Sequence, residues 1–275
     1  TWDGVRLTTM RCTFPRFILS EFNTHRKFSR NSASSRAIPV KRQIELVRES
    51  PFIPQAWPKN QAGMQAREEV SPWNAAHALL DWETAIGEMI ATAENLAGYG
   101  VHKQIASRLL EPFMWHTVIV SSTEWDNFFL QRDHEDAQPE MQTLAKAMRK
   151  ALDESTPMPL SIHIPFLSQL DSENDEEEKF EALMIRSVAR CARVSYGREL
   201  EEKTYEEDVA LVERLIRSGH WSPLEHVAWV DTGFAADNEA RDDPRATHLG
   251  NFSLPWNQLR HHWRKFLPSI AARLE

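Results

Sequence analysis

Residues 22–40 read FNTHRKFSRNSASSRAIPV, and this stretch concentrates positive charge, hydroxyls and amide groups in a protein that is acidic overall. Between residues 16 and 42 the chain carries seven basic residues and one acidic residue, whereas the whole chain of 275 residues has a net charge of −8. Arginine offers a planar fork that matches phosphate oxygens, and serine and asparagine add small donors. The stretch therefore predicts an anion-binding loop. The alternative is a surface loop that pairs with the chain's own acidic residues.

The composition limits the class of protein. With 41% hydrophobic residues, the chain can bury the core of one elaborated domain, residues 1–275. The acidic balance disfavours binding to a nucleic acid duplex or to RNA. Cys12 and Cys191 are too few for a disulfide scaffold and have no metal-ligand spacing. No membrane span or signal-peptide pattern is visible, so we expect a soluble cytoplasmic protein without nucleic acid or membrane partners.

Hydrophobic periodicity predicts the elements of the first half. Alternation predicts a strand over residues 5–13, and a short helix follows over 16–23. Ser71 as N-cap and Pro72 at the first position predict a long helix to about residue 96, whose repeated apolar residues would face the core. A capping box at residues 121–124 predicts a helix that continues through residue 130. Other helices are expected over residues 44–48, 102–110 and 139–152.

An acidic segment, DSENDEEEK at residues 171–179, divides the chain into two sequence blocks, 1–170 and 180–275. Its six acidic residues and one lysine predict a solvated linker. Beyond it, Thr204 and Glu207 form a capping box. The second block is expected to contain helices over 180–192, 204–218 and 255–267, a strand over 227–232 and an exposed loop over 235–248.

The basic loop resembles the signature of the flavin-dependent thymidylate synthases, the ThyX family. The signature runs Arg-His-Arg, two residues, Ser, one residue, Asn-Glu, one residue, Ser, one residue, Arg-Tyr. This chain matches its spacing with Thr24-His25-Arg26, Ser29, Asn31, Ser34 and Arg36. It departs from the signature at Thr24 (Arg in the family), Ser32 (Glu) and Ala37 (Tyr).

Two further segments resemble the same family. Residues 127–132, NFFLQR, with Ala137-Gln138 and Glu140, are similar to one family segment. Residues 192–195 and 219–226, GHWSPLEH, resemble a segment that precedes the signature in typical members but follows it here. The reversed order predicts a circular permutation, which would place the strands at 5–13 and 227–232 in one sheet. The tail from Gly250 is loosely similar to longer, often phage-encoded relatives.

The resemblance implies an α+β, helix-rich fold with a small, mostly antiparallel sheet. It also implies FAD as cofactor, NADPH and methylenetetrahydrofolate as cosubstrates, and a homotetramer. The residues expected to bind the flavin are His25, Arg26, Asn31, Asn127, Ser195, Ser222 and Glu225. Those expected around a pyrimidine nucleotide are Glu21, Ser34, Arg36, Arg108 and Arg132. The catalytic candidates are Arg132, Ser34, Arg36 and His220, with His220 beside the flavin ring or its phosphates.

The substrate implied by the family is deoxyuridylate, which would be methylated at C5 to thymidylate. Deoxycytidylate stays open as an alternative because Ser32 replaces the family's Glu and Glu21 could accept a hydrogen bond from a cytosine amino group. A noncatalytic nucleotide-binding or flavin-binding relative is a further alternative. No metal site is expected, since the adjacent His261 and His262 would point apart on a helix. No G-x-S-x-G elbow surrounds Ser34, and no Rossmann or P-loop glycine motif occurs.

Overall fold

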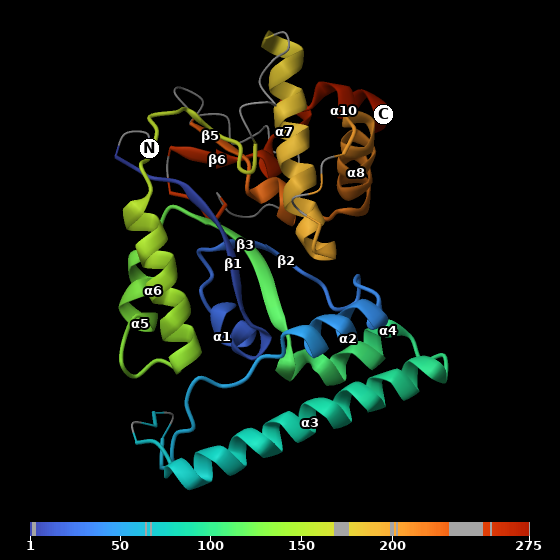
Figure 1. Cartoon of the computed structure of the whole chain (residues 1–275). Helices are drawn as coiled ribbons and strands as arrows, with labels where there is room; N and C mark the ends of the chain where they lie inside the picture. The colour runs from blue at the N-terminus through green and yellow to red at the C-terminus, as the bar shows by residue number, and fades with distance from the viewer. Residues whose placement is uncertain are drawn as a thin grey trace.

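The computed structural model is rich in helices and contains two small antiparallel sheets, which confirms the predicted α+β class (Figure 1). In the part of the chain that it describes, no helix is both long and apolar enough to cross a bilayer. The described residues are 1, 4–63, 65–66, 68–167, 176–198, 201, 203–230, 250–253 and 255–274, with the backbone alone at 176–179.

The first sheet has the order β1-β3-β2, with strands Thr8–Pro15, Trp115–Ser122 and Ser29–Ser32. Both outer strands run antiparallel to β3, which places Cys12 opposite Val118 and Asn31 opposite Ile119. The central strand β3 reads WHTVIVSS and is buried along most of its length, as expected for a β-branched strand covered on both faces. The strand β2, which carries part of the basic motif, is therefore an edge strand.

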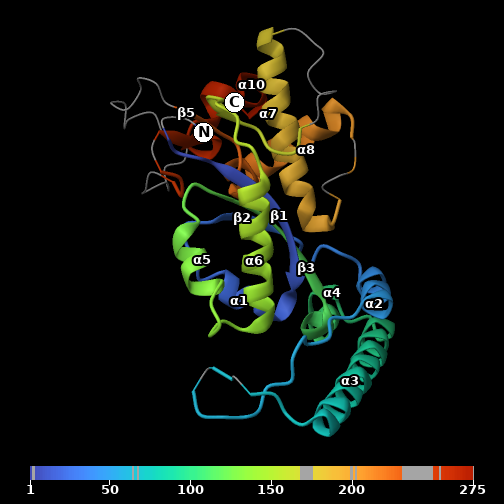
Figure 2. The ribbon, with the colours of Figure 1, turned by 60° about the vertical axis from the view of Figure 1, so that its left-hand side comes forward.

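Helices close the first sheet on one face (Figures 1 and 2). Their core is largely aromatic and includes Phe14, Phe22, Phe28 and Phe128. The helices that contribute to it are α1 (Leu19–Phe22), α5 (Asp126–Arg132) and α6 (Pro139–Glu154). A second layer, at the lower end of the sheet, consists of η1 (Arg16–Ile18), α2 (Val40–Glu49), α3 (Pro72–Gly98), α4 (Lys103–Ala106) and η2 (Ser107–Phe113).

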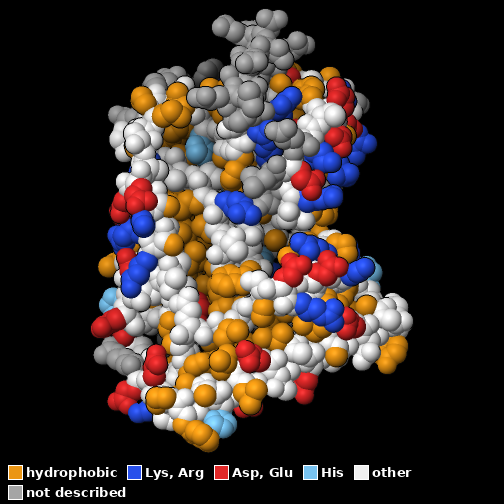
Figure 3. Space-filling view, in the orientation of Figure 1, with side chains coloured by type: hydrophobic (Ala, Val, Ile, Leu, Met, Phe, Trp, Pro, Cys, Tyr) orange, Lys and Arg blue, Asp and Glu red, His pale blue; other side chains and the backbone are white. Residues whose placement is uncertain are grey.

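The long helix α3 begins as the sequence predicts. The Ser71 hydroxyl accepts a hydrogen bond from the Asn74 amide at 3.2 Å, and a proline occupies the first helical position. Only its second half buries the predicted apolar face, through residues such as Ile86 and Ile90. Trp73 and Leu80 in the first half are 72% and 60% exposed. Figure 3 shows hydrophobic side chains gathered along this lower part of the molecule.

The second half of the chain forms a helical layer beside a second sheet. In α8 (Tyr205–Ser218), Thr204 and Glu207 make the predicted capping box, and Gly219 ends the helix with a left-handed φ of 72°. This helix packs against α7 (Glu176–Arg193) and α10 (Pro268–Leu274) around a core that includes Val188. The second sheet has the order β4-β5-β6, with strands Ile162–His163, Ala228–Val230 and Trp256–Gln258.

Two secondary-structure predictions are wrong. Ser121 and Ser122 do not cap a helix but end β3, because the β-branched run before them pairs with β1; α5 begins only at Asp126. The predicted helix over 255–267 is replaced by β6, η6 (Leu259–His261) and α9 (Trp263–Phe266). The extended segment that begins at Trp256 pairs with β5, and this pairing overrides the helical pattern.

The strand β5 does not join the sheet of β1, so the prediction of one shared sheet is wrong. The two sheets are nevertheless neighbours, because Val5 and Leu7 pack in one apolar cluster with Val230 and Trp256. Of the predicted acidic linker, residues 176–179 form the first turn of α7, and residues 171–175 lie outside the described residues. The predicted loop at 235–248 also lies outside them.

Candidate functional site

Arg132, the last residue of α5, gathers three residues of the first half around its guanidinium. Its Nε donates to His25 Nε2 at 2.9 Å, one terminal nitrogen pairs with the Glu21 carboxylate, and the other donates to Thr24 Oγ1 at 3.3 Å. Glu21 belongs to α1, and the other two partners lie in the turn that follows it. We call these four residues the arginine cluster. The structure thus brings His25, a predicted flavin residue, together with Glu21 and Arg132, which were predicted to lie around the nucleotide.

His25 is held neutral in this cluster. Burial, followed by the positive charges of Arg132 and Arg30, lowers the pKa of His25 to about 4. Because arginine can only donate, Nε2 of His25 accepts the hydrogen bond and the proton of the neutral ring lies on Nδ1. The ring also packs edge-on against Phe128, with centroids 4.9 Å apart. His25 is therefore oriented on both sides before any ligand binds.

A second group of polar residues lies where β2 meets the second half of the chain. Asn31 Nδ2 donates to the Cys191 carbonyl of α7 at 2.6 Å, and its Oδ1 accepts from the Ser222 hydroxyl at 3.2 Å. Ser222 and Glu225 belong to the 3-10 helix η5 (Ser222–Glu225). We call Ser29, Asn31, Ser222, Glu225, Gln258 and Arg260 the seam cluster. It brings three of the predicted flavin residues, Asn31, Ser222 and Glu225, to one edge of the first sheet.

The loop after β2 is held from both sides. The Ser34 amide donates to the carbonyl of Ser195, in η4 (Val194–Tyr196), at 3.0 Å. The Ser35 hydroxyl donates to Glu111 at 2.8 Å, and Gln43, which is fully buried, donates to the Ser35 carbonyl at 2.6 Å. The structure thus places Ser34 beside Ser195. Sequence reasoning missed Gln43 and Glu111, since no local pattern marks a side chain that braces a distant loop.

Glu111 also binds two arginines, of which Arg108 was predicted to lie near a nucleotide. Arg16 and Arg108 lie 3.0 and 2.7 Å from the Glu111 carboxylate. Burial raises the pKa of Glu111, but the hydrogen bond from Ser35 and the charges of Arg16 and Arg108 outweigh it, so the pKa lies below its usual value. Arg16 is further engaged by His116 Nδ1 at 2.8 Å. Both arginines are thus committed to a bracing network behind the loop.

Four predicted residues lie apart from these clusters and are exposed: Arg26, Arg36, Asn127 and His220. The side-chain Oδ1 of Asn127 accepts a hydrogen bond from Gln131 Nε2 at 3.2 Å, and Asn127 lines a surface pocket with Leu130 and Arg149. His220 Nδ1 lies 2.7 Å from the Ser218 hydroxyl at the end of α8. The fold of this chain alone does not bring these four side chains into the arginine or seam clusters.

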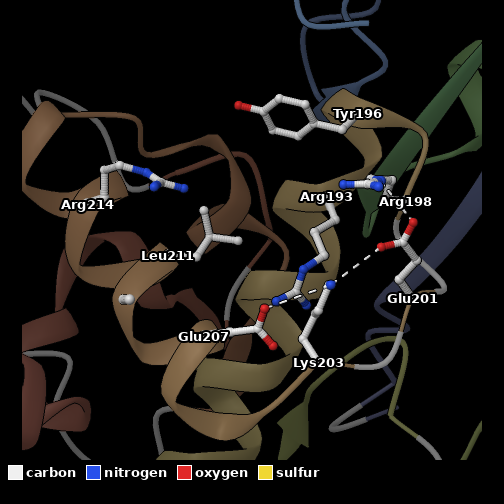
Figure 4. Close-up of a pocket in the computed structure, with 9 residues that line it drawn as sticks. Arg193, Tyr196, Arg198, Glu201, Lys203, Glu207, Leu211 and Arg214 are labelled. Carbon is white, nitrogen blue, oxygen red and sulfur yellow. Dashed lines mark ion pairs between the residues drawn. The ribbon is translucent and has the colours of Figure 1, made fainter. Parts of the chain in front are cut away.

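Two adjoining pockets flank the turn after η4. One, of about 380 Å³, lies between α7 and α8 and is lined by Arg193, Lys203 and Arg214 among others; Figure 4 shows Lys203 paired with Glu201 and Glu207. The second, of about 570 Å³, is lined by residues 37–39 of the basic loop, by Arg42 and by Tyr196. Ala37, where the family signature has tyrosine, therefore faces open space beside the loop.

No metal centre is evident in the described ranges. They hold no group of three or more His, Cys, Asp or Glu residues arranged to bind an ion. The thiols are also unsuited to nucleophilic chemistry, because burial raises the pKa of Cys12 to about 12 and raises the pKa of Cys191 further. The arginines, amides and hydroxyls of the two clusters can position ligands and compensate their charge.

Comparison with known proteins identifies the family. The model of the family "Thymidylate synthase complementing protein" matches residues 6–158 and 183–230, well over half of the chain. Two crystal structures of a UMP/dUMP methylase, PolB from Streptomyces cacaoi, bound with 5-Br dUMP and with 5-Br UMP, resemble the fold with TM-scores of 0.44 and 0.45 at 17% identity. Each alignment covers 54% of this chain and 67% or 69% of the other. No curated protein matches the chain. The match over both halves shows that the chain belongs to the thymidylate synthase complementing protein family, the ThyX family, and is a methyltransferase of the flavin-dependent thymidylate synthase type.

Proposed function

We propose that this protein methylates C5 of deoxyuridylate, with methylenetetrahydrofolate as the one-carbon donor, FAD as the hydride carrier and NADPH as the reductant. The observation that carries this proposal is the arginine cluster, in which residues from the basic motif and from α5 surround one guanidinium. Family membership supports the reaction type. No protein nucleophile is needed, because the flavin supplies the redox chemistry when it is bound.

The nucleotide would lie between the basic loop and the arginine cluster. Ser34 and the exposed Arg36 would bind its phosphate, since a hydroxyl and an arginine fork are good donors to phosphate oxygens. Arg132 would face the pyrimidine edge and Glu21 the sugar or base. Arg108 would act near the phosphate only if the nucleotide competes with Glu111 for its guanidinium.

The seam cluster fits a flavin dinucleotide by the chemistry of its donors. It offers two hydroxyls, two carboxamides, a carboxylate and an arginine along one sheet edge, polar groups that suit a diphosphate and the polar edge of a flavin ring. The residues that would hold the flavin are His25, Arg26, Asn31, Asn127, Ser195, Ser222 and Glu225, with His220 beside its ring or phosphates. Neutral His25 can donate from Nδ1 without adding charge.

The exposed members of this set fit a site completed by another subunit. Asn127 and His220 lie apart from the clusters within one chain. A homotetramer, which the family resemblance predicts, would also bury apolar surface such as Trp73 and Leu80 on α3. Light scattering of the purified protein measures the oligomeric state, and a stable monomer that is active would contradict this arrangement.

Deoxycytidylate is the second candidate substrate, because a carboxylate such as that of Glu21 could accept a hydrogen bond from a cytosine amino group. A cytosine presents an amino group where uracil presents a carbonyl, so a carboxylate near the base would suit cytosine. In the arginine cluster the Glu21 carboxylate is already paired with Arg132, which favours uracil because the arginine remains the group that faces the base.

Product analysis decides between these proposals. The protein is incubated with FAD, NADPH, methylenetetrahydrofolate and either nucleotide, and the mass of each product is measured. We expect a gain of one methyl group on deoxyuridylate. Methylation of deoxycytidylate alone would overturn the choice of base, and flavin uptake without methylation of either nucleotide would indicate a noncatalytic relative.

A further inference from the structure

A segment outside the family match reaches into the seam cluster. The match ends at residue 230, yet Gln258 in β6 donates from Nε2 to the Ser29 hydroxyl at 2.7 Å and to the Glu225 carbonyl at 2.8 Å. Asn251 Nδ2 donates to the same hydroxyl at 3.1 Å. Ser29 is fully buried, so the motif strand completes its hydrogen bonds with partners more than 200 positions later in the chain.

The backbone of this segment is shaped for that contact. Gly250 has a φ of 91°, a conformation that favours glycine, and a Cβ atom there would lie 2.5 Å from Gln258 Oε1. The Asn251 amide donates to this same oxygen at 3.2 Å, which fixes the orientation of the carboxamide. The donor end of Gln258 is therefore directed at Ser29 and at η5.

Arg260 fixes the side chain of Glu225. The two form an ion pair whose side chains are 23% and 14% exposed, so water screens the pair only partly. The negative charge of Glu225 also acts on Arg30 of β2. Burial lowers the pKa of Arg30, and the charge of Glu225 opposes that decrease. Glu225 thus forms an ion pair with a cation from beyond the family match, and its charge also acts on a cation of β2.

We infer that Gln258 and Arg260 are positioning residues of the flavin site, which act by fixing Glu225 and strand β2. The inference rests on the proposed function, because it assigns the flavin to the seam cluster. Without Arg260, the carboxylate of Glu225 would remain partly buried and lack its main partner, and it would reorient toward solvent. Without Gln258, the β2 edge and η5 would lose the side chain that joins them.

The full-length protein tests this inference through its affinity for FAD, measured by titration of flavin absorbance and fluorescence. We expect Arg260→Ala to raise the dissociation constant about 10- to 100-fold, the range for losing a charge-assisted hydrogen bond. Gln258→Ala should raise it about 2- to 10-fold, because Gln258 donates to the neutral Ser29 hydroxyl and Glu225 carbonyl. Arg260→Lys keeps the charge and should recover part of the affinity. The control is Arg273→Ala on the exposed face of α10, which removes the same charge and should change affinity by less than about 2-fold.

A double mutant separates positioning from general destabilisation. If Arg260 acts through Glu225, then Arg260→Ala should have little further effect on FAD affinity in a Glu225→Gln background. Tight FAD binding by a folded Arg260→Ala protein, together with weak binding by Glu225→Gln, would overturn the inference and leave the proposed function intact. Equal effects of Arg260→Ala in both backgrounds would also overturn it. A wild-type protein that takes up no flavin would overturn the inference and the proposed function together.

Discussion

The arginine cluster lies within the first half of the chain, whereas the seam cluster joins both halves. Arg132 still has part of its side chain in solvent, 20% exposed, and uses three of its five N–H groups on the partners described. Ser29, Asn31 and Gln258 in the seam cluster are buried and bonded to one another or to backbone. A ligand can therefore compete for the contacts of the arginine cluster, while the seam cluster forms when the protein folds.

Next to the seam cluster, a partly buried chain of hydrogen bonds joins the two sheets, and the largest effect is expected when acid breaks this chain. His163 Nε2 lies 2.7 Å from the Thr9 hydroxyl, which contacts Ser121, and the Ser121 hydroxyl lies 2.8 Å from His226 Nδ1. Burial, with lesser contributions from nearby positive charges, lowers the pKa of His163 to about 4 and that of His226 to about 3.

The sign of the effect follows from these values. An unfolded histidine has a pKa of about 6.5, so below that pH the unfolded chain binds protons that the folded chain does not. The free energy of unfolding is therefore complete above about pH 6.5 and should fall steadily as the pH falls toward 4. Urea unfolding between pH 7.5 and 4.5 measures it. His226→Gln should flatten the slope, whereas the exposed His77→Gln should not; a wild-type slope of zero would contradict the prediction.

Arg132→Ala should remove the centre of the arginine cluster and leave the hydrogen bonds of the seam cluster unchanged. We expect nucleotide binding to weaken by about 1.5–3 kcal/mol, the range for hydrogen bonds to charged groups, with little change in the unfolding transition. Calorimetric titration with deoxyuridylate measures the loss. Arg149→Ala is the matched control, because Arg149 pairs with Asp133, the residue that follows α5, and not with a member of the arginine cluster. Unchanged nucleotide affinity in Arg132→Ala would remove Arg132 from the site.

The two clusters also differ in how far the sequence predicts them. Thr24, His25 and Arg132 lie in segments whose internal spacing identifies the family, so the arginine cluster could be assembled from local motifs. Helix α8 was likewise predictable, since its capping box and terminal glycine act within a few residues. Local patterns cannot report contacts between residues 29 and 258, and so the sequence predicted no role at the site for Gln258 and Arg260, which lie in the tail that is similar to longer relatives.

Local signals also failed where tertiary pairing competes with them. Ser121 and Glu124 satisfy the pattern of a capping box, yet Ser121 pairs with Thr9 across the first sheet. The stretch from Trp256 reads as helical by composition, but β5 supplies a partner that the sequence alone does not show. Both errors concern strands whose pairing partners are distant in sequence, so the local pattern does not contain the interaction that decides the structure.

A double-mutant cycle tests the hydrogen bond between Asn31 and Ser222 in the seam cluster. Asn31→Ala leaves the Cys191 carbonyl without its donor and should lower the free energy of unfolding by about 1–3 kcal/mol. Ser222→Ala should cost about 0.5–1.5 kcal/mol alone and less in the Asn31→Ala background, because the two side chains share one hydrogen bond. Urea unfolding measures the free energy of unfolding of the two single variants and of the double mutant. Ser218→Ala, exposed on α8, is the control, and strict additivity would show that the pair does not interact.

The smallest effect is expected where a circular permutation would have joined the two sequence blocks. The permutation is a proposal; the contact of Val5 and Leu7 with Val230 supports it, because the end of the second block's strand lies beside the start of the first block. If the segment between Asp171 and Glu178 is only a covalent join, its length should matter little. Loop-closure entropy predicts a cost of about 0.6 kcal/mol for each doubling of its length.

Insertion of a glycine-serine segment of equal length after Asp171 tests this prediction. The protein should keep one cooperative unfolding transition and its affinity for FAD, because a segment that only joins the two blocks contributes to neither cluster. Insertion of the same segment after Ala33 is the matched control, because it separates β2 from the loop that carries Ser34 and should abolish nucleotide binding. Loss of cooperative unfolding after the first insertion would show that residues 171–178 do more than connect the blocks and would count against the permutation.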